Sequence, residues 1–149
     1  MAILEKNRIK LQATAVNKED AIRQAGALLV ESGCVAAPYV DGMLAREETM
    51  STYLGNGVSI PHGQYEDRGH IKQTGISVLQ VPAGVLWDDD DEDELAYLII
   101  GIAANSDEHM TVLSNLAEAI EDPDMAEELA RTNDADLIMR CLSGVPNSA

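Results

Sequence analysis

The spacing of apolar residues changes along the first part of the chain. Across residues 9–16 the apolar side chains occupy mostly every second position, which is the pattern of a half-buried β-strand. Across residues 21–29 they recur at intervals of three and four residues, as on one face of a helix. Asn17, with Asp20 three residues later, provides the cap of this helix, and Gly33 provides its end. The pattern predicts a strand followed by a helix.

A helix and two further strands are expected in the middle of the chain. Pro38 is a favoured first residue of a helix, and the apolar positions after it extend that helix to Arg46 or slightly beyond. Residues 53–63 hold three glycines and one proline among short apolar residues, which predicts loop and short strand. Residues 75–81 predict a strand followed by a turn at residues 82–84. Residues 95–104 are continuously apolar, as in a central strand covered on both faces.

The last third of the chain predicts helices. Asn105 and Glu108 form a variant of the capping box, and they open a helix whose apolar stripe is Met110, Leu113, Leu116, Ala117 and Ile120. Pro123 ends this helix or begins the next one. Short helices are expected at residues 125–131 and 134–142, and a loose tail at residues 144–149. Residues 1–149 are thus expected to form a single α/β domain, in which a mixed β-sheet is flanked by helices on both faces.

Composition narrows the class of protein. The chain has 149 residues, of which 46% are hydrophobic, and this suits one domain with its own core. No run approaches the roughly 18 to 20 apolar residues of a membrane span, and the N-terminus lacks the features of a signal peptide. We therefore expect a soluble, cytoplasmic protein that does not insert into a membrane. Cys34 and Cys141 lack the spacing of a metal site and are expected to be reduced thiols.

The formal net charge of −16 limits the partners. It would repel nucleic acids and anionic membranes, whereas it would attract a protein with a positive patch. The acidic run at residues 88–94 does not match a calcium-binding loop, because Glu94 stands where that loop needs glycine, so a solvated loop between two strands is expected. The sequence contains no nucleotide-binding or metal-binding motif, so neither a cofactor nor a metal is expected.

The residue with the clearest chemical potential is His62. Pro61 before it forces residue 60 into an extended conformation, and Gly63 after it lets the backbone pass close to a ligand. A neutral imidazole held at a strand end can attack phosphorus without first losing a proton. Taken alone, however, this pattern is more often that of a turn residue than of a nucleophile.

Several motifs surround His62 in a fixed order. They are Met43-Leu44-Ala45-Arg46-Glu47, Leu54-Gly55, Val58, Ile60-Pro61-His62-Gly63, Lys72, Thr74-Gly75, Pro82, Gly84-Val85, Leu98-Ile99-Ile100-Gly101-Ile102-Ala103-Ala104, Asn105 and Glu108-His109. Together they resemble the mannitol/fructose-type (type 2) enzyme IIA domains of the phosphoenolpyruvate-dependent sugar phosphotransferase system (PTS), and the mannitol-specific branch most of all. The resemblance runs from about residue 17 to residue 142. Ser59 departs from it, because the family commonly has alanine there.

The resemblance implies a phosphocarrier. His62 would accept a phosphoryl group from phosphorylated HPr and donate it to a cysteine of the cognate sugar-specific EIIB, which serves a membrane EIIC permease, with mannitol uptake as the expected process. It implies that Arg46 and His109 lie beside the phosphohistidine. Arg46 suits bidentate contact with phosphoryl oxygens, and backbone N–H groups near Gly63 are further candidates for that contact. Such a protein is formally a phosphotransferase.

Other interpretations of these residues stay open. Arg46 could be a helix-end arginine paired with a carboxylate. His109 lies four and seven residues before Leu113 and Leu116, on the inward face of its helix, and could be a core histidine with satisfied hydrogen bonds. Either Glu47 or Glu48 could orient Arg46 or His62 without touching the phosphoryl group, or each could be a solvated acid at a helix end.

Two other functions compete with the phosphocarrier. One is a regulatory relative, similar to the nitrogen-related IIA proteins, whose phosphorylation state controls partners without sugar transport. The other is a non-catalytic α/β binding module. No segment resembles an EIIB or EIIC domain, so a free-standing IIA protein or an isolated IIA domain is expected. His70 is expected at the surface, and Trp87 is expected to close the core and not to contact a partner.

Overall fold

The computed structural model describes residues 4, 6–88, 91–104 and 106–142. Side chains are described for these residues except 65, 88, 91–94, 106–110, 112 and 113. The tail predicted at residues 144–149 and the predicted capping residue Asn105 lie outside the described residues.

The strands form one mixed sheet in the order β1-β4-β5-β3-β2. β4 (Gly75–Asp88) and β5 (Asp91–Ala103) are antiparallel and lie at its centre. β1 (Ile9–Lys10) runs parallel to β4, and β3 (Val58–Ser59) runs parallel to β5. β2 (Tyr53–Gly55) pairs antiparallel with β3 at the edge. The central position of β5, buried on both faces, agrees with its continuous apolar run.

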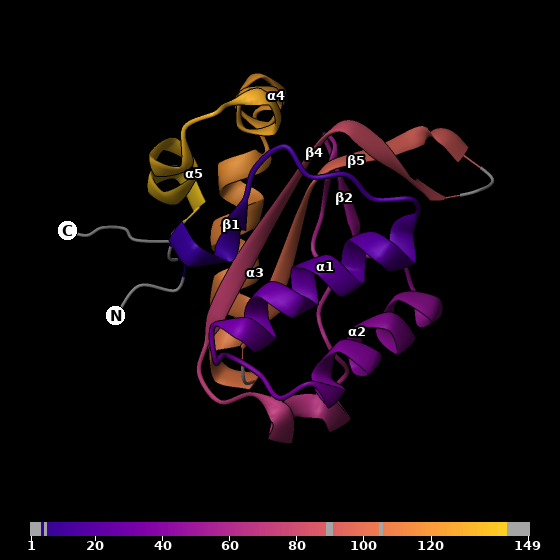
Figure 1. The fold of residues 1–149 in the computed structure, drawn as a ribbon, viewed down its shortest axis with the longest axis vertical. Helices are drawn as coiled ribbons and strands as arrows, with labels where there is room; N and C mark the ends of the chain where they lie inside the picture. The colour runs from indigo at the N-terminus through magenta and orange to yellow at the C-terminus, as the bar shows by residue number, and fades with distance from the viewer. Residues whose placement is uncertain (1–3, 5, 89–90, 105, 143–149) are drawn as a thin grey trace.

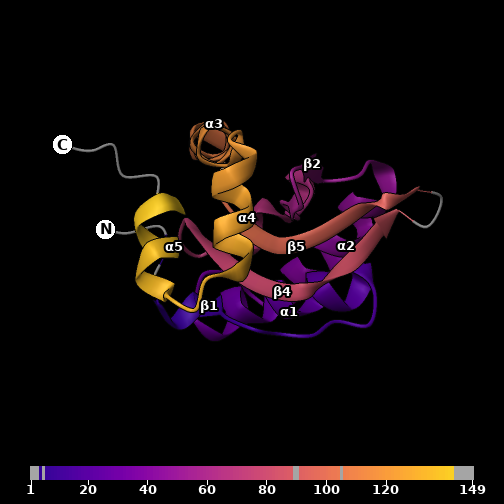
Figure 2. The same cartoon turned by 90° about the horizontal axis from the view of Figure 1, so that it is seen from above.

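Helices cover both faces of this sheet (Figure 2). α1 (Lys18–Glu31) and α2 (Pro38–Thr49) lie on one face. α3 (Ser106–Ile120), α4 (Pro123–Arg131) and α5 (Ala135–Leu142) lie on the other. The predicted α/β class, with a mixed sheet flanked by helices on both faces, is confirmed. Pro123 begins α4, which settles the choice that the sequence left open.

The side chains of the central strands alternate between two cores. Leu98, Ile100 and Ile102 of β5 pack with the buried residues of α3, α4 and α5. Ile99 and Ala103 of the same strand point the opposite way and pack with α1 and α2. Because successive side chains of a strand point to opposite faces, one apolar strand can serve both layers.

The strand predicted over residues 9–16 is shorter than expected. β1 ends at Lys10, because Gln12 adopts a left-handed conformation with φ of 55°, which interrupts extended pairing. The N–H of Ala13 still donates to the carbonyl of Gln80 at 2.8 Å, which keeps the segment beside β4. The alternation of apolar residues beyond Lys10 therefore reflects contact with β4, although these residues do not form a regular strand.

The turn predicted at residues 82–84 is wrong. β4 continues through these residues, and its register with β5 shifts between Gln80 and Val85. The irregular stretch accommodates Pro82, which has no N–H for the ladder, and Gly84, which has φ of 85°. Residues typical of turns can therefore also form a bulge within a long strand.

In the acidic run at residues 88–94, for which a solvated loop was expected, the described residues have the backbone of a strand. Asp88 pairs with Asp91, and residues 91–94 belong to β5, so the run lies at the end of the β4–β5 hairpin. This hairpin projects from the body of the fold (Figure 1). Main-chain hydrogen bonding between antiparallel strands does not require apolar side chains, which is why charge alone did not indicate where the strands end.

Tyr39 ties α2 to the sheet. Its hydroxyl donates to the carbonyl of Ile102 in β5 at 2.8 Å, and it accepts the N–H of Gly63 at 3.0 Å. The residue is only 3% exposed. Burial raises the pKa of Tyr39 to about 12, although the hydrogen bond from Gly63 acts in the opposite direction. Three segments that are distant in the sequence therefore meet at one hydroxyl group.

Two buried serines allow a matched test of side-chain hydrogen bonding. Among the described residues, the Ser59 hydroxyl is a buried group without a hydrogen-bond partner, whereas Ser77, equally buried, donates to the carbonyl of Ala25 at 2.8 Å. We predict that Ser59→Ala raises the free energy of unfolding by about 1 kcal/mol, because an unpaired buried hydroxyl is costly. Ser77→Ala should lower it by about 1 kcal/mol. Urea unfolding measures both, and a destabilised Ser59→Ala would contradict the prediction.

The raised pKa of Tyr39 predicts a loss of stability at alkaline pH. In the unfolded chain this phenol ionises near pH 10, and in the folded protein near pH 12. The folded state therefore keeps a proton that the unfolded state has lost, so stability falls as pH rises between these values. Tyr39→Phe should remove roughly 2 kcal/mol of this dependence. Unfolding curves for both proteins at pH 9 to 12 test this, and parallel curves would refute it.

Candidate active site

His62 lies directly after β3, where the chain runs beside β5. The N–H of Ile102 donates to the carbonyl of Pro61 at 3.0 Å, and His62 forms a parallel bridge with Ile102. The expected place at a strand end is therefore correct. His62 is 9% exposed, so most of its surface is covered while one side remains accessible. Pro61 has a fixed φ, which restricts the path of the chain into His62 and so helps to set the direction of the ring.

The hydrogen bond at Nδ1 determines the tautomer of His62. Nδ1 lies 2.8 Å from the carbonyl oxygen of Ile60, two residues earlier. A carbonyl oxygen can only accept, so Nδ1 carries the proton in the neutral ring. Nε2 is then the nitrogen with the lone pair. The main chain thus selects which nitrogen can act as a nucleophile.

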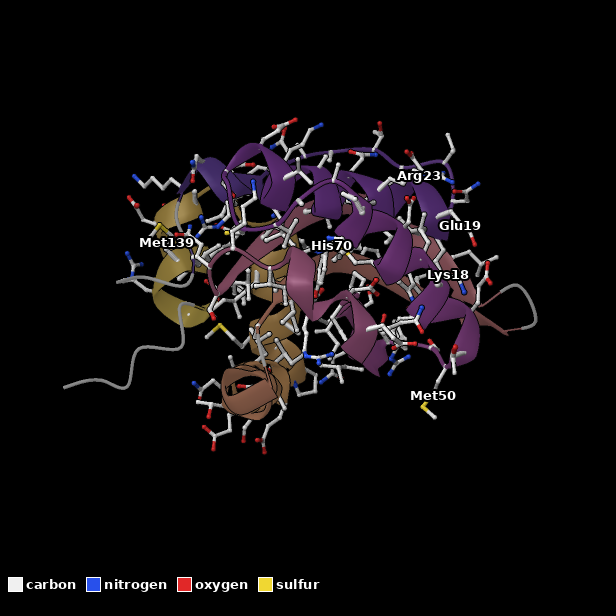
Figure 3. All side chains as sticks on the ribbon, turned by 90° about the horizontal axis from the view of Figure 1, so that it is seen from below. Lys18, Glu19, Arg23, Met50, His70 and Met139 are labelled. Carbon is white, nitrogen blue, oxygen red and sulfur yellow. The ribbon has the colours of Figure 1, made fainter. Side chains whose placement is uncertain are left out.

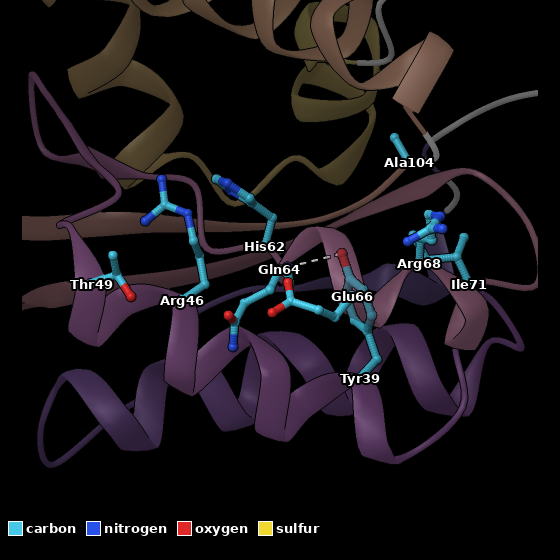
Figure 4. Close-up of a pocket in the computed structure, with 10 residues that line it drawn as sticks. Tyr39, Arg46, Thr49, His62, Gln64, Glu66, Arg68, Ile71 and Ala104 are labelled. Carbon is cyan, nitrogen blue, oxygen red and sulfur yellow. Dashed lines mark hydrogen bonds between the residues drawn. The ribbon is translucent and has the colours of Figure 1, made fainter.

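A cavity of about 440 Å³ opens in front of His62 (Figure 4). Arg46 and Arg68 both line it, together with Tyr39 and Gln64. In the close-up, the imidazole of His62 and the guanidinium of Arg46 point in the same direction on neighbouring segments, and Arg68 lies on the other side of His62. Arg46 and Arg68 supply two positive charges to a cavity that Glu66 also lines, and the part of it beside Arg46 and His62 is a favourable place for an anion.

Arg46 belongs to the last turn of α2. Its Nη1 donates to the carbonyl of Met50, the residue that caps the helix, at 2.7 Å. This contact is the helix-end role that the sequence left open as an alternative. The same side chain also lines the cavity, and a guanidinium has five N–H donors, so capping leaves other donors for an anion.

The backbone N–H of Gly63 has a hydrogen-bond partner within the chain. It donates to the hydroxyl of Tyr39, although Gly63 also lines the cavity, so contact between backbone N–H groups near Gly63 and a phosphoryl group stays a prediction. A Cβ on Gly63 would lie 2.6 Å from a ring carbon of Tyr39. The tyrosine ring packs against the backbone of Gly63 and leaves no room for a side chain at this position.

Glu47 is buried, so the interpretation of this residue as a solvated acid at a helix end is wrong. It is 5% exposed, and its carboxylate accepts hydrogen bonds from the Trp87 indole at 3.0 Å and from Thr52. Trp87 itself is 2% exposed, so its predicted place in the core is confirmed. The carboxylate contacts neither Arg46 nor His62 through these bonds, and its influence on them is indirect.

Arg68 and Gln64 reach the cavity from a 3-10 helix, η2 (Tyr65–His70), which the sequence did not predict. This helix docks on α2 at Gly42, where an added Cβ would fall 2.0 Å from a carboxylate oxygen of Asp67. That carboxylate accepts the N–H of Gln64 at 2.8 Å and so caps η2. Two features of the sequence could have indicated this helix: Gly42, which has no side chain, and Asp67, an acid three residues after Gln64.

The structure describes the side chain of His70 but not that of His109. The backbone of His109 lies in α3, but its side chain lies outside the described part, so its inward orientation stays a prediction. His70 ends η2 and is half-buried, so the predicted surface position is only partly right. Its place on the lower side of the fold is visible in Figure 3.

Neither a membrane-spanning helix nor a cluster of metal ligands is found among the described residues. None of the helices in that part of the chain is both long and apolar enough to cross a membrane. Within the same residues, no three His, Cys, Asp or Glu side chains are grouped so as to hold a metal ion.

Two proteins of known identity are similar to almost the whole chain. A multiphosphoryl transfer protein of Salmonella typhimurium is 47% identical over 134 residues, which are 90% of this chain and 35% of that protein. A PTS system mannitol-specific EIICBA component of Pasteurella multocida is 43% identical over 140 residues, which are 94% of this chain and 22% of that protein. The chain thus spans about a third or less of these relatives.

A solved structure and a family description agree with this similarity. The structure of the complex of enzyme IIAMtl and phosphorylated enzyme IIBMtl from Escherichia coli contains a chain that matches with a TM-score of 0.88 and 38% identity, over 95% of this chain and 99% of that one. Residues 2–144 match the family described as phosphoenolpyruvate-dependent sugar phosphotransferase system, EIIA 2. The chain therefore belongs to the EIIA type 2 family of the phosphoenolpyruvate-dependent sugar phosphotransferase system.

Proposed function

We propose that this chain, as a single EIIA domain over residues 1–149, is a phosphocarrier that holds a phosphoryl group on Nε2 of His62. The observation that carries the proposal is the hydrogen bond from Nδ1 of His62 to the Ile60 carbonyl, inside a cavity that Arg46 also lines. This bond leaves the lone pair at Nε2, and neutral imidazole is a nucleophile toward phosphorus. Membership of the EIIA type 2 family supports the same reaction.

The transfer needs no proton movement at His62. In the accepting step, the Nε2 lone pair attacks phosphorus, a P–N bond forms, and the bond between phosphorus and the donor breaks with its electrons returning to the donor. In the donating step, a cysteine thiolate of the acceptor attacks the same phosphorus, a P–S bond forms, and the P–N electrons return to Nε2. The proton stays bound to Nδ1 throughout, hydrogen-bonded to the Ile60 carbonyl.

Arg46 is proposed to stabilise the group in transit. Phosphoryl transfer passes through a loose transition state with charge on three equatorial oxygens, so the protein contributes positioning and electrostatic stabilisation. The planar, permanently charged guanidinium of Arg46 is suited to this. His109 is proposed to contribute a second hydrogen bond from the first turns of α3, as the resemblance implies.

The partners are proposed from the resemblance to the EIIA family and from the names of the relatives. Phosphorylated HPr is the proposed donor, and the EIIB of a membrane EIIC permease is the proposed acceptor, both reached in the cytoplasm. The mannitol-specific relative and the EIIA–EIIB complex support mannitol as the transported sugar. The acidic net charge favours association with a basic partner surface. The mannitol-specific similarities favour sugar transport over a regulatory role without transport.

Phosphorylation of His62 is the first prediction of this proposal. Incubation with phosphoenolpyruvate, enzyme I and HPr should add one acid-labile phosphate, detected by intact mass, and His62→Ala should abolish it. The wild-type adduct should carry phosphorus on Nε2, which nitrogen-15 and phosphorus-31 NMR distinguish from Nδ1. His70→Ala serves as the control, because that histidine should remain unmodified. An equal mass shift in His62→Ala would exclude the proposal, and a stable adduct that reaches no sugar-specific EIIB would favour the regulatory role.

The role of Arg46 predicts a defect in the rate of transfer. Arg46→Ala should lower the rate constant of phosphoryl transfer by about 100-fold, which is typical when one donor that stabilises transition-state charge is removed. Arg140→Ala, on the exposed side of α5, should leave the rate unchanged. Rapid-quench measurements with phosphorylated HPr give both rates, and equal rates for the two variants would remove Arg46 from the mechanism.

A further inference from the structure

We propose that Glu47 is a positioning residue that fixes Arg46 and His62 relative to each other through a buried hydrogen-bond network with Trp87 and Thr52. The inference rests on the proposed function, in which Arg46 and His62 act on the same phosphoryl group. It goes beyond that function because Glu47 and Trp87 touch neither the phosphoryl group nor the cavity in front of His62.

Glu47 is the node of the network. Its Oε2 accepts the indole N–H of Trp87 at 3.0 Å, its Oε1 accepts the hydroxyl of Thr52, and the Thr52 N–H lies 3.2 Å from both oxygens. Nζ of Lys18 lies 3.8 Å from Oε2 and supplies a compensating charge. A carboxylate only 5% exposed would be costly without such partners, so its burial here indicates a defined geometry.

One branch of the network leads to His62. The carbonyl of Thr52 accepts the N–H of Ile60 at 2.9 Å, and the carbonyl of Ile60 accepts the Nδ1–H of His62 at 2.8 Å. A continuous series of hydrogen bonds therefore runs from the Glu47 carboxylate to the imidazole. The coupling is mechanical: a shift of Thr52 moves the segment after β3 that contains Ile60 and, with it, the carbonyl that orients the ring.

The other branch leads to Arg46. Arg46 precedes Glu47 in the last turn of α2, and its guanidinium is held by the carbonyl of Met50. Met50 lies between Glu47 and Thr52 in the chain, so the Glu47–Thr52 contact closes the turn that presents this carbonyl. The Met50 side chain projects away from the fold (Figure 3), so its main chain makes the contact that matters here.

An amide cannot replace the carboxylate in this network. Thr52 donates to one oxygen and Trp87 donates to the other, whereas glutamine offers one acceptor oxygen and one donor NH₂ group. With its oxygen towards Thr52, the glutamine turns its NH₂ group towards the Trp87 N–H, which can only donate; with its oxygen towards Trp87, it turns that group towards Thr52, where the hydroxyl can turn to accept but the backbone N–H loses one of its two acceptors. The neighbouring Glu48 is exposed, so Glu48→Gln makes the same chemical change without this conflict and is the matched control.

The first arm of the experiment measures geometry without phosphoryl transfer. The chain has one tryptophan and three histidines, so the Trp87 indole N–H and the His62 ring nitrogens give few NMR signals to assign. Glu47→Gln should shift the indole signal and reduce the share of the Nδ1–H tautomer of His62, whereas Glu48→Gln should change neither. An unchanged His62 tautomer in a folded Glu47→Gln protein overturns the proposal, whether or not the protein proves to be a phosphocarrier.

The second arm measures transfer from phosphorylated HPr. Glu47→Gln should lower kcat by roughly 10- to 100-fold with little change in KM, as expected when reacting groups are displaced on the ångström scale. In an Arg46→Ala background the same substitution should have a smaller effect, because the two residues act on one step. An unchanged kcat, or a fully additive loss in the double variant, overturns the proposal.

A third variant covers the case in which Glu47→Gln does not fold. Trp87→Phe keeps an aromatic ring in the core but removes the indole N–H that Glu47 accepts. Its kcat should lie between those of the wild type and Glu47→Gln, and its change in the His62 tautomer should be smaller than that of Glu47→Gln. Wild-type transfer and a wild-type His62 spectrum in folded Trp87→Phe would overturn the network as proposed. A wild-type protein that takes no phosphate would refute the proposed function alone, since the NMR arm is still decisive.

Discussion

The attachment of the His62 segment to β5 is the constraint on which the site depends. The Ile102 N–H and the Pro61 carbonyl join this segment to the central strand, and the Tyr39 hydroxyl bridges the next residue, Gly63, to the same strand. Because β5 is buried between two helical layers, it is among the most rigid elements of the fold. A histidine fixed to such a strand keeps its direction while partners with different shapes approach it.

The fold was predictable wherever a periodic pattern or a continuous apolar run was long. α1 and α2 appeared as expected from their helical spacing, and the apolar part of β5 appeared as expected from its long continuous apolar run. The prediction failed at Gln12 and around Pro82, where a left-handed residue and a bulge change the backbone without changing the apolar pattern. The β2–β3 hairpin had a usable local signal, since Asn56 and Gly57 adopt the positive φ values of a tight hairpin turn.

The site was only partly predictable, because its contacts join residues far apart in the sequence. His62 was found from its own neighbours, and Arg46 from the order of motifs around it. Tyr39 was missed as a site residue and Glu47 was partly misjudged, since their partners Ile102 and Trp87 are brought to them only by the packing of α2 on the sheet. The hydrogen bond from the Gly63 N–H to Tyr39 was not foreseen for the same reason, because the tyrosine is 24 residues away in the chain.

The tautomer of His62 has a consequence for repeated cycles. A ring that used both nitrogens would have to exchange a proton with water, or flip, before it could serve the next partner. With the Nδ1 proton held by the Ile60 carbonyl, the proposed carrier returns after each donation to the state from which it began. Donor and acceptor then meet the same atom from the same open side, so they compete for one surface and must alternate.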